Sequence, residues 1–172
     1  GGCCGTREDH IQLLYEGLDK KRPKPAPPAA IPMLASPVQA VAMQQVPAPF
    51  LIGERLNTQG SKHFKRMVME EDYDAIVEMA RAQVESGAHG LDVCVALTET
   101  ANENELMAKV VKKLANAVPV PLVIDSTELD VIEVALKTNP GRSLINSTNL
   151  EAGPDKPKAI FSLAKQFNAA VI

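Results

Sequence analysis

The sequence predicts an α/β fold, and more specifically part of a (β/α)₈ barrel. Short apolar runs alternate with amphipathic helical stripes from residue 50 to residue 172, which is the pattern of βα units around a parallel sheet. Four such units and a fifth strand take up about 120 residues, whereas a complete barrel needs about 250. The pattern therefore predicts about half of a barrel.

The expected elements follow one another in regular order. Strands are expected at 49–53, 89–97, 120–127, 142–148 and 168–172, and helices at 72–85, 103–118, 129–137 and 156–167. The strand segments are continuous apolar runs, as in strands that are covered on both faces. The helical segments repeat their apolar residues every three or four positions, which places those residues on one face.

Residues 20–49 are predicted to be a linker. Eight of the thirteen prolines of the chain lie here, and proline fixes φ and removes a backbone donor. The segment 31–46 is less polar than a free linker, so part of it is expected to lie against a neighbouring surface.

The first nineteen residues predict a short helix. Thr6 is the expected N-cap, and Ile11, Leu14 and Leu18 fall on one helical face. A single helix buries too little surface to be a domain by itself. We therefore expect three parts: the C-terminal remnant of another domain at 1–19, a linker at 20–49 and the N-terminal half of a barrel at 50–172.

Composition excludes several classes of function. The net charge is −3 and aromatic residues make up 3% with no Trp, so a nucleic-acid surface is not expected. No apolar run reaches the roughly 18 to 20 residues that a membrane span needs. The beginning of the chain shows no signal-peptide pattern, and three cysteines do not make a disulfide framework. A cytoplasmic protein is expected.

An acid or an amide stands at the end of each of the first four strands. These residues are Glu54 and Asn57, Asp92, Asp125, and Asn146. Because the carboxyl ends of parallel strands meet at one edge of a sheet, we expect these side chains to line one cavity. Carboxylates and amides suit a ligand with paired N–H donors and a carbonyl, such as a pterin, purine or pyrimidine. The alternative is that Asp125, Ser126 or Thr127 caps the helix that follows.

Four segments carry a resemblance to a known family. Residues 52–66, 87–96, 123–137 and 141–153 resemble, in order and spacing, the pterin-binding barrel of methyltetrahydrofolate methyltransferases. That family includes the corrinoid iron–sulfur protein methyltransferases and the cobalamin-dependent methionine synthases. Independently, residues 1–11 resemble the end of the homocysteine-binding barrel of those methionine synthases, where a linker joins the two barrels.

The resemblance implies a pterin- and folate-binding set. It comprises Glu54, Asn57, Gly60, Ser61, Lys62, Asp92, Asp125 and Asn146. It also implies that Cys3 and Cys4 are two of three zinc thiolates, with the third absent from the chain, so zinc is expected to be held weakly. The family usually has Asn where this chain has Cys94, and a thiol is a poorer hydrogen-bond partner than an amide. No catalytic residue is assigned.

The implied activity is methyl transfer from methyltetrahydrofolate to a cobalamin carried by another domain or protein, in methionine synthesis. One alternative is a stand-alone pterin-binding methyltransferase that serves another corrinoid protein, or a dihydropteroate-synthase-like enzyme, whose condensing motifs are not seen. Another is a truncated, non-catalytic chain that binds pterin at most. Because half a barrel leaves sheet edges at 49–53 and 168–172, we expect the chain alone to associate and to be inactive in methyl transfer.

Overall fold

The computed structural model describes residues 5–18, 31–97, 102–151 and 153–172. The chain divides into two compact units, residues 1–30 and residues 31–172. The first unit contains one helix, α1 (Glu8–Gly17), among its described residues. Its N-cap is Arg7, whose N–H donates to His10 Nδ1 at 3.3 Å, so the expected cap at Thr6 is wrong by one residue. The helix buries none of its residues within this unit, as expected of a single helix.

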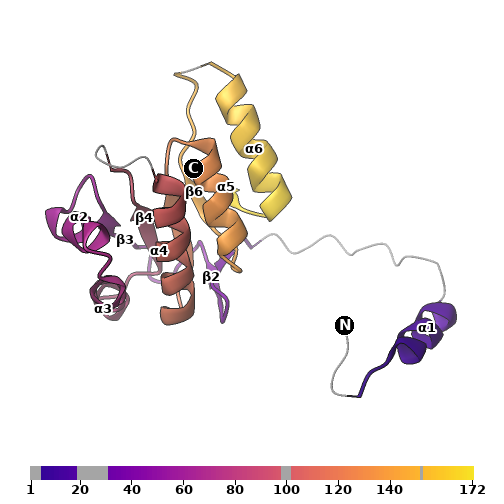
Figure 1. The fold of residues 1–172 in the computed structure, drawn as a ribbon. Coiled ribbons are helices and arrows are strands. Elements are labelled where there is room, and N and C mark those ends of the chain that lie inside the picture. Colours follow the sequence, from indigo (N-terminus) through magenta and orange to yellow (C-terminus); the bar gives the residue numbers. More distant parts are fainter. Residues whose placement is uncertain (1–4, 19–30, 98–101, 152) are drawn as a thin grey trace. The chain divides into compact units, whose positions relative to one another are not determined.

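The second unit is built on a five-stranded parallel sheet with the order β3-β4-β5-β6-β7. Its strands are β3 (Ile52–Asn57), β4 (Gly90–Cys94), β5 (Leu122–Asp125), β6 (Leu144–Asn146) and β7 (Ala170–Val171). Its helices are α2 (Lys62–Met69), α3 (Tyr73–Glu85), α4 (Glu103–Ala117), α5 (Leu129–Thr138) and α6 (Asp155–Phe167). Figure 1 shows α4, α5 and α6 side by side in chain order, as βα units require.

The predicted fold class is confirmed: strands and helices alternate, and every pair of neighbouring strands in this sheet is parallel. The last four strands lie inside their expected ranges. The first expected strand is present, but its bounds are wrong, because β3 covers 52–57 instead of 49–53 and includes the polar Glu54 and Arg55. A register shift between Gly53 and Leu56 accommodates this part of the strand against β4.

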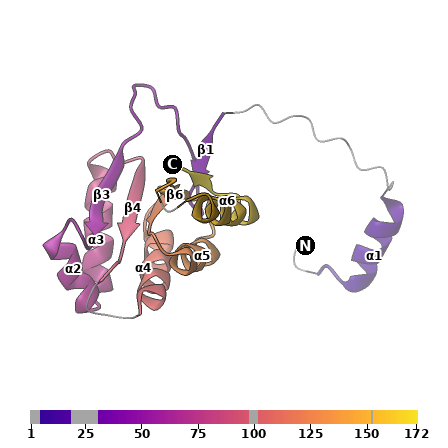
Figure 2. The ribbon, with the colours of Figure 1, turned by 90° about the horizontal axis from the view of Figure 1, so that it is seen from above.

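The apolar core lies mainly between the sheet and the helices. Strand residues that point to this side, such as Leu56, Val93 and Ile124, are fully buried with α3, α4 and α5 residues. Figure 2 shows this arrangement from above, with the helices along the outer side of the strands. Because side chains alternate along a strand, the intervening residues face the other side of the sheet.

The inner face of the sheet carries a second, smaller apolar cluster. Val123 and Leu144 pack there with Leu34, and Ile52 and Ala170 lie against them. Leu34 comes from a hairpin of β1 (Met33–Ala35) and β2 (Ala40–Ala42), which the sequence did not predict. The expectation that part of 31–46 lies against a neighbouring surface is confirmed.

Arg142 holds this hairpin against the amino-terminal end of β6. The carbonyl oxygen of Arg142 accepts from the N–H of Ala35 at 3.1 Å, and its Nη1 donates to the carbonyl of Met33 at 2.7 Å. Residues 31–49 thus belong to the same compact unit as the sheet, and residues 20–30 lie outside the described residues. The division into domains at 1–19, 20–49 and 50–172 stays a prediction.

Within the described ranges, no helix has the length and apolar character needed to cross a membrane. The helix α2 was also missed, because it follows directly on a loop-like sequence and carries four basic or histidine side chains among its first five residues. Its buried Phe64, Met67 and Val68 have helical spacing and face the core.

We predict that Gly141→Ala destabilises the second unit by about 1 to 3 kcal/mol, as overpacking does. A β-carbon at Gly141 would lie 2.1 Å from the carbonyl oxygen of Ala35, so the hairpin would have to move. Chemical denaturation of both proteins measures the loss. Gly60→Ala is the matched control, because nothing lies within 4 Å of a β-carbon there. Equal midpoints for Gly141→Ala and wild type would show that the hairpin is not closely docked.

Candidate functional site

Four polar side chains form a row across the carboxyl ends of β3, β4, β5 and β6. The parallel register pairs Asn57 with Cys94 and Asp125 with Asn146. The pair Val93–Ile124 precedes Cys94 and Asp125, so these two residues are also adjacent. The register of the sheet therefore brings side chains from four separate sequence segments to one edge.

Asp92 lies one inward-facing position below this row. It stands in register with Val123, which in turn pairs with Leu144, and both of those side chains belong to the inner apolar cluster with Leu34. The Asp92 side chain is therefore next to an apolar floor, and the residue is only 3% exposed.

Two amide–carboxylate hydrogen bonds connect these residues, and each one crosses an intervening strand. Asn57 on β3 donates from Nδ2 to Asp125 Oδ2 on β5 at 3.2 Å. Asn146 on β6 donates from Nδ2 to Asp92 Oδ1 on β4 at 3.1 Å. Inside a curved parallel barrel, side-chain layers come from alternate strands, which explains why the partners are two strands apart.

Burial changes the acid–base behaviour of both carboxyl groups. Burial raises the pKa of Asp92 to about 6; the hydrogen bond from Asn146 opposes this, and the charges of Asp125 and Glu54 add to it. The pKa of Asp125 is also raised, chiefly by burial, while hydrogen bonds from Cys94 and Asn57 oppose the rise. Asp92 can therefore hold a proton near pH 6.

Cys94 stands beside Asp125 in the row, two residues after Asp92 on β4. Its side chain is buried, with 6% of the residue exposed. Burial raises the pKa of the thiol to about 11, and the nearby carboxylates raise it further, so the thiol carries its proton at neutral pH. A backbone hydrogen bond with Ala96 acts in the opposite direction.

Asn57 also shapes the loop that follows β3. Its Oδ1 accepts from the N–H groups of Gln59 and Gly60, at 2.8 Å and 3.2 Å. Ser61 then caps α2 by accepting from the N–H of Phe64 at 3.2 Å. Gly60 and Ser61 therefore have visible structural roles in the loop, whereas their predicted contact with a folate stays a prediction.

The remaining two predicted residues lie apart from the hydrogen-bonded row. Lys62 is exposed at the first position of α2. Glu54 is exposed on β3 and lines a groove of about 850 Å³ along β3, α2 and α3. Its charge still acts on Asp92 and Asp125, since it raises the pKa of both. In that groove Gln83 accepts from the N–H of Arg55 at 2.9 Å and so satisfies a donor of β3.

The helix-capping alternative is wrong for Asp125, Ser126 and Thr127, because the N-cap of α5 is Glu128 and it has no side-chain capping bond. Ser126 Oγ accepts from the N–H of Glu128 at 3.1 Å, just before α5, and it donates to Glu103 at 3.3 Å. The Asp125 side chain accepts from Asn57 Nδ2 instead. Sequence reasoning missed Thr58, which is 5% exposed and donates to the carbonyl of Ala96 at 2.6 Å; nothing in its pattern distinguished it from a surface loop residue.

The described residues contain no group of three or more His, Cys, Asp or Glu side chains that could hold a metal ion. The predicted zinc ligands Cys3 and Cys4 lie outside the described residues.

Comparison with known proteins agrees with this geometry. A family model described as pterin binding enzyme matches residues 53–172. The chain belongs to the family of pterin-binding enzymes. The resemblance drawn from the four sequence segments is thereby confirmed.

The relatives agree with the family. The chain is 34% identical over 181 aligned residues to a methionine synthase of Mycobacterium leprae, and 34% identical over 177 to one of Mycobacterium tuberculosis. Both alignments cover all of this chain and 15% of the relative, so the chain spans a small part of the curated proteins that it matches. It is thus a pterin-binding domain homologous to methionine synthase.

Solved structures show the same fold. A Thermus thermophilus dihydropteroate synthase, solved in complex with 6HMPPP, has a TM-score of 0.55 at 22% identity over 81% of this chain and 48% of its own. A Xanthomonas albilineans dihydropteroate synthase has a TM-score of 0.54 at 18% identity over 83% of this chain and 49% of its own. The chain thus corresponds to about half of those pterin-binding barrels.

We predict that Asp92→Asn stabilises the second unit at pH 7 by about 1 to 3 kcal/mol. A folded-state pKa of about 6, against an ordinary 3.8, means that the native state binds a proton that the unfolded chain has released between those values. Asp92 therefore lowers stability as the pH rises through this window. The amide keeps an acceptor for Asn146.

Unfolding free energies from pH 4 to pH 8 test this prediction. The advantage of Asp92→Asn should be absent near pH 4, grow up to about pH 6 and then stay constant. Asp130→Asn is the control, because a hydrogen bond from Asn104 lowers the pKa of that exposed carboxyl, so its removal should not stabilise. A constant advantage at every pH would contradict the assigned cause.

Proposed function

We propose that the inner face at the ends of β3 to β6 binds the pterin ring of methyltetrahydrofolate, and that the chain takes part in methyl transfer from this folate to a cobalamin in methionine synthesis. The observation that carries the proposal is the convergence of two amide–carboxylate pairs, Asn57–Asp125 and Asn146–Asp92, at one edge of the sheet. The family match and the identity to methionine synthases support the same ligand class.

The site can recognise a pterin by hydrogen bonding. An ionised Asp125 accepts N–H donors from an amino-heterocycle, and the side-chain oxygen of Asn146 provides a further acceptor, since its Nδ2 already donates to Asp92. The apolar floor formed by Leu34, Val123 and Leu144 excludes water below the ring and strengthens these bonds.

Methyl transfer needs a better leaving group than a free amine anion. N5 of the folate becomes one when it is protonated or accepts a hydrogen bond, so a site that holds a proton near the ring assists the reaction. Asp92, with its raised pKa, is the carboxyl of the hydrogen-bonded pairs best suited to hold a proton at its side-chain oxygen near neutral pH. A Co(I) corrin on another domain or protein would supply the methyl acceptor.

The zinc implied by the resemblance would be held by Cys3 and Cys4 together with a third thiolate in a full-length enzyme. A homocysteine thiolate bound to that zinc would receive the methyl group in a full-length enzyme. We place this activity in the cytoplasm. Glu54, Gly60, Ser61 and Lys62 are proposed to line the outer part of the folate site.

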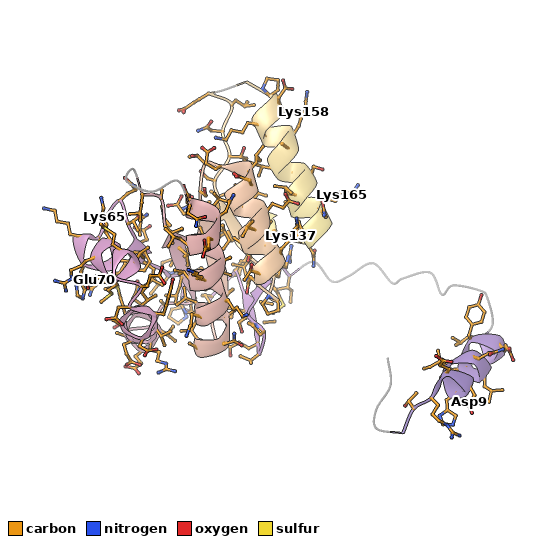
Figure 3. The ribbon with its side chains drawn as sticks, in the orientation of Figure 1. Asp9, Lys65, Glu70, Lys137, Lys158 and Lys165 are labelled. Atoms are coloured by element: carbon orange, nitrogen blue, oxygen red, sulfur yellow. The ribbon has the colours of Figure 1, made fainter. Side chains whose placement is uncertain are left out.

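Pterin binding is tested with Asp125→Asn. We expect affinity for methyltetrahydrofolate to fall about tenfold to a hundredfold, because a charged acceptor becomes a neutral amide with only one acceptor oxygen. Titration calorimetry at pH 7 measures the change. Glu133→Gln is the control; Glu133 pairs at 2.7 Å with Lys137, labelled on α5 in Figure 3. Equal losses in both variants would refute a direct role for Asp125.

A second assay separates the proposed roles. The chain is mixed with methyltetrahydrofolate and free cob(I)alamin, and formation of methylcobalamin is followed by its spectrum. We expect binding of the folate without turnover. Turnover would favour the alternative of a stand-alone methyltransferase, and failure of wild type to bind any pterin would refute the proposed function.

A further inference from the structure

We propose that Cys94 is a positioning residue, whose protonated thiol donates a hydrogen bond to Asp125 and, together with Asn57, fixes that carboxylate for the ligand. The ligand part of this inference rests on the proposed function, whereas the hydrogen bond itself does not. Cys94 therefore has a role that a buried apolar side chain of the same size could not fill.

The first support is geometric. Cys94 stands between Asn57 on one side, with which it is paired in register, and Asp125 on the other. Asn57 reaches across the strand of Cys94 to bond Asp125 Oδ2 at 3.2 Å. Cys94 therefore stands on the strand between the two partners of this bond and next to Asp125.

The second support comes from acidity and burial. A hydrogen bond from the Cys94 thiol lowers the pKa of Asp125, and one from the backbone of Ala96 lowers the pKa of the thiol. Cys94 is 6% exposed, so water has little access to the thiol.

The third support is the charge of the surroundings. The titratable groups whose charges act on Asp125 and Cys94 are Glu54 from β3, Asp92 from β4 and Glu103 from α4, and all of them are acids. A negatively charged neighbour would add to their repulsion. A thiol that keeps its proton supplies a neutral donor, which favours the ionised state of Asp125 against this field.

A weak donor also has a use at this position. An S–H group gives a weaker hydrogen bond than an O–H or N–H group. Asp125 is therefore oriented by Cys94 while it keeps acceptor strength for the N–H groups of a ligand. A stronger donor in the same place would compete more with the ligand for the same oxygen atoms.

The test compares wild type with Cys94→Ala and Cys94→Ser. In Cys94→Ala the donor is lost, so the pKa of Asp125 should rise and the affinity for methyltetrahydrofolate should fall about three- to tenfold at pH 7. The acid side of the binding–pH profile should move to higher pH, because binding needs the ionised carboxylate. In Cys94→Ser a stronger hydroxyl donor replaces the thiol, so the acid side should return to the wild-type position or move to lower pH.

One measurement without ligand and one control variant separate the inference from pterin binding and from stability. Carboxyl ¹³C NMR titration without ligand follows the protonation of Asp125 directly, with Asp125→Asn used to assign its signal. Val93→Ala is the matched control, because Val93 is buried on the opposite face of β4 and its truncation destabilises without removing a donor.

An Asp125 pKa that is unchanged in Cys94→Ala, or that rises equally in Val93→Ala, would overturn the inference, as would a serine variant that behaves like alanine. If wild type binds no pterin but the NMR titration shows the expected rise in Cys94→Ala, the proposed function fails and the hydrogen bond stands. If wild type binds pterin but the Asp125 pKa does not rise in Cys94→Ala, the proposed function stands and the hydrogen bond from Cys94 is refuted.

Discussion

Burial of two carboxylates on the inner face of the sheet is the constraint on which the rest of the site depends. A buried charge is costly unless it is hydrogen-bonded, and here each Asp has an amide donor from a strand two places away. Such partners meet only if the sheet is parallel, in the observed register and curved as in a barrel. The site is thus a property of the sheet and not of any one loop.

The hairpin at residues 33–42 packs on the inner face below the site, and its hydrogen bonds go to Arg142 at the amino-terminal end of β6. Its Leu34 packs on Val123 and Leu144, which occupy the same level of the sheet as Asp92. Leu34 thus covers the apolar floor beside Asp92, a residue whose pKa is raised chiefly by burial. Close contacts with Gly141 and Arg142 fix the position of the hairpin.

The sequence predicted the four most central site residues for a simple physical reason. Asp125 and Asn146 end apolar segments, Asn57 ends β3 and Asp92 lies two residues before the end of β4, and the ends of parallel strands must meet. It could not predict which residue bonds to which, because the strand-skipping pairs depend on the curvature of the sheet. It also could not place Glu54, since the register shift in β3 is not visible as a pattern in the chain.

The hairpin and α2 were missed for different reasons. Proline density at 20–49 is typical of a spacer, and only the tertiary contact of Leu34 gives the short strands β1 and β2 a place to pack. In α2 the spacing of Phe64, Met67 and Val68 was present, but eight residues are too few for a clear periodic signal beside a loop. The boundaries of α3 to α6 agree with expectation within one residue, because long apolar stripes allow few alternatives, whereas β4 to β7 are shorter than their expected ranges.

Both members of each amide–carboxylate pair, Asn57–Asp125 and Asn146–Asp92, lie on the strands β3 to β6. The groups that would recognise a pterin ring are held together by one continuous sheet, with Asn57 bonding both the site and the loop that leads to α2. In the proposed function, recognition of the pterin thus depends on the register of four strands, whereas the methyl acceptor would be brought to the same edge by another domain or protein.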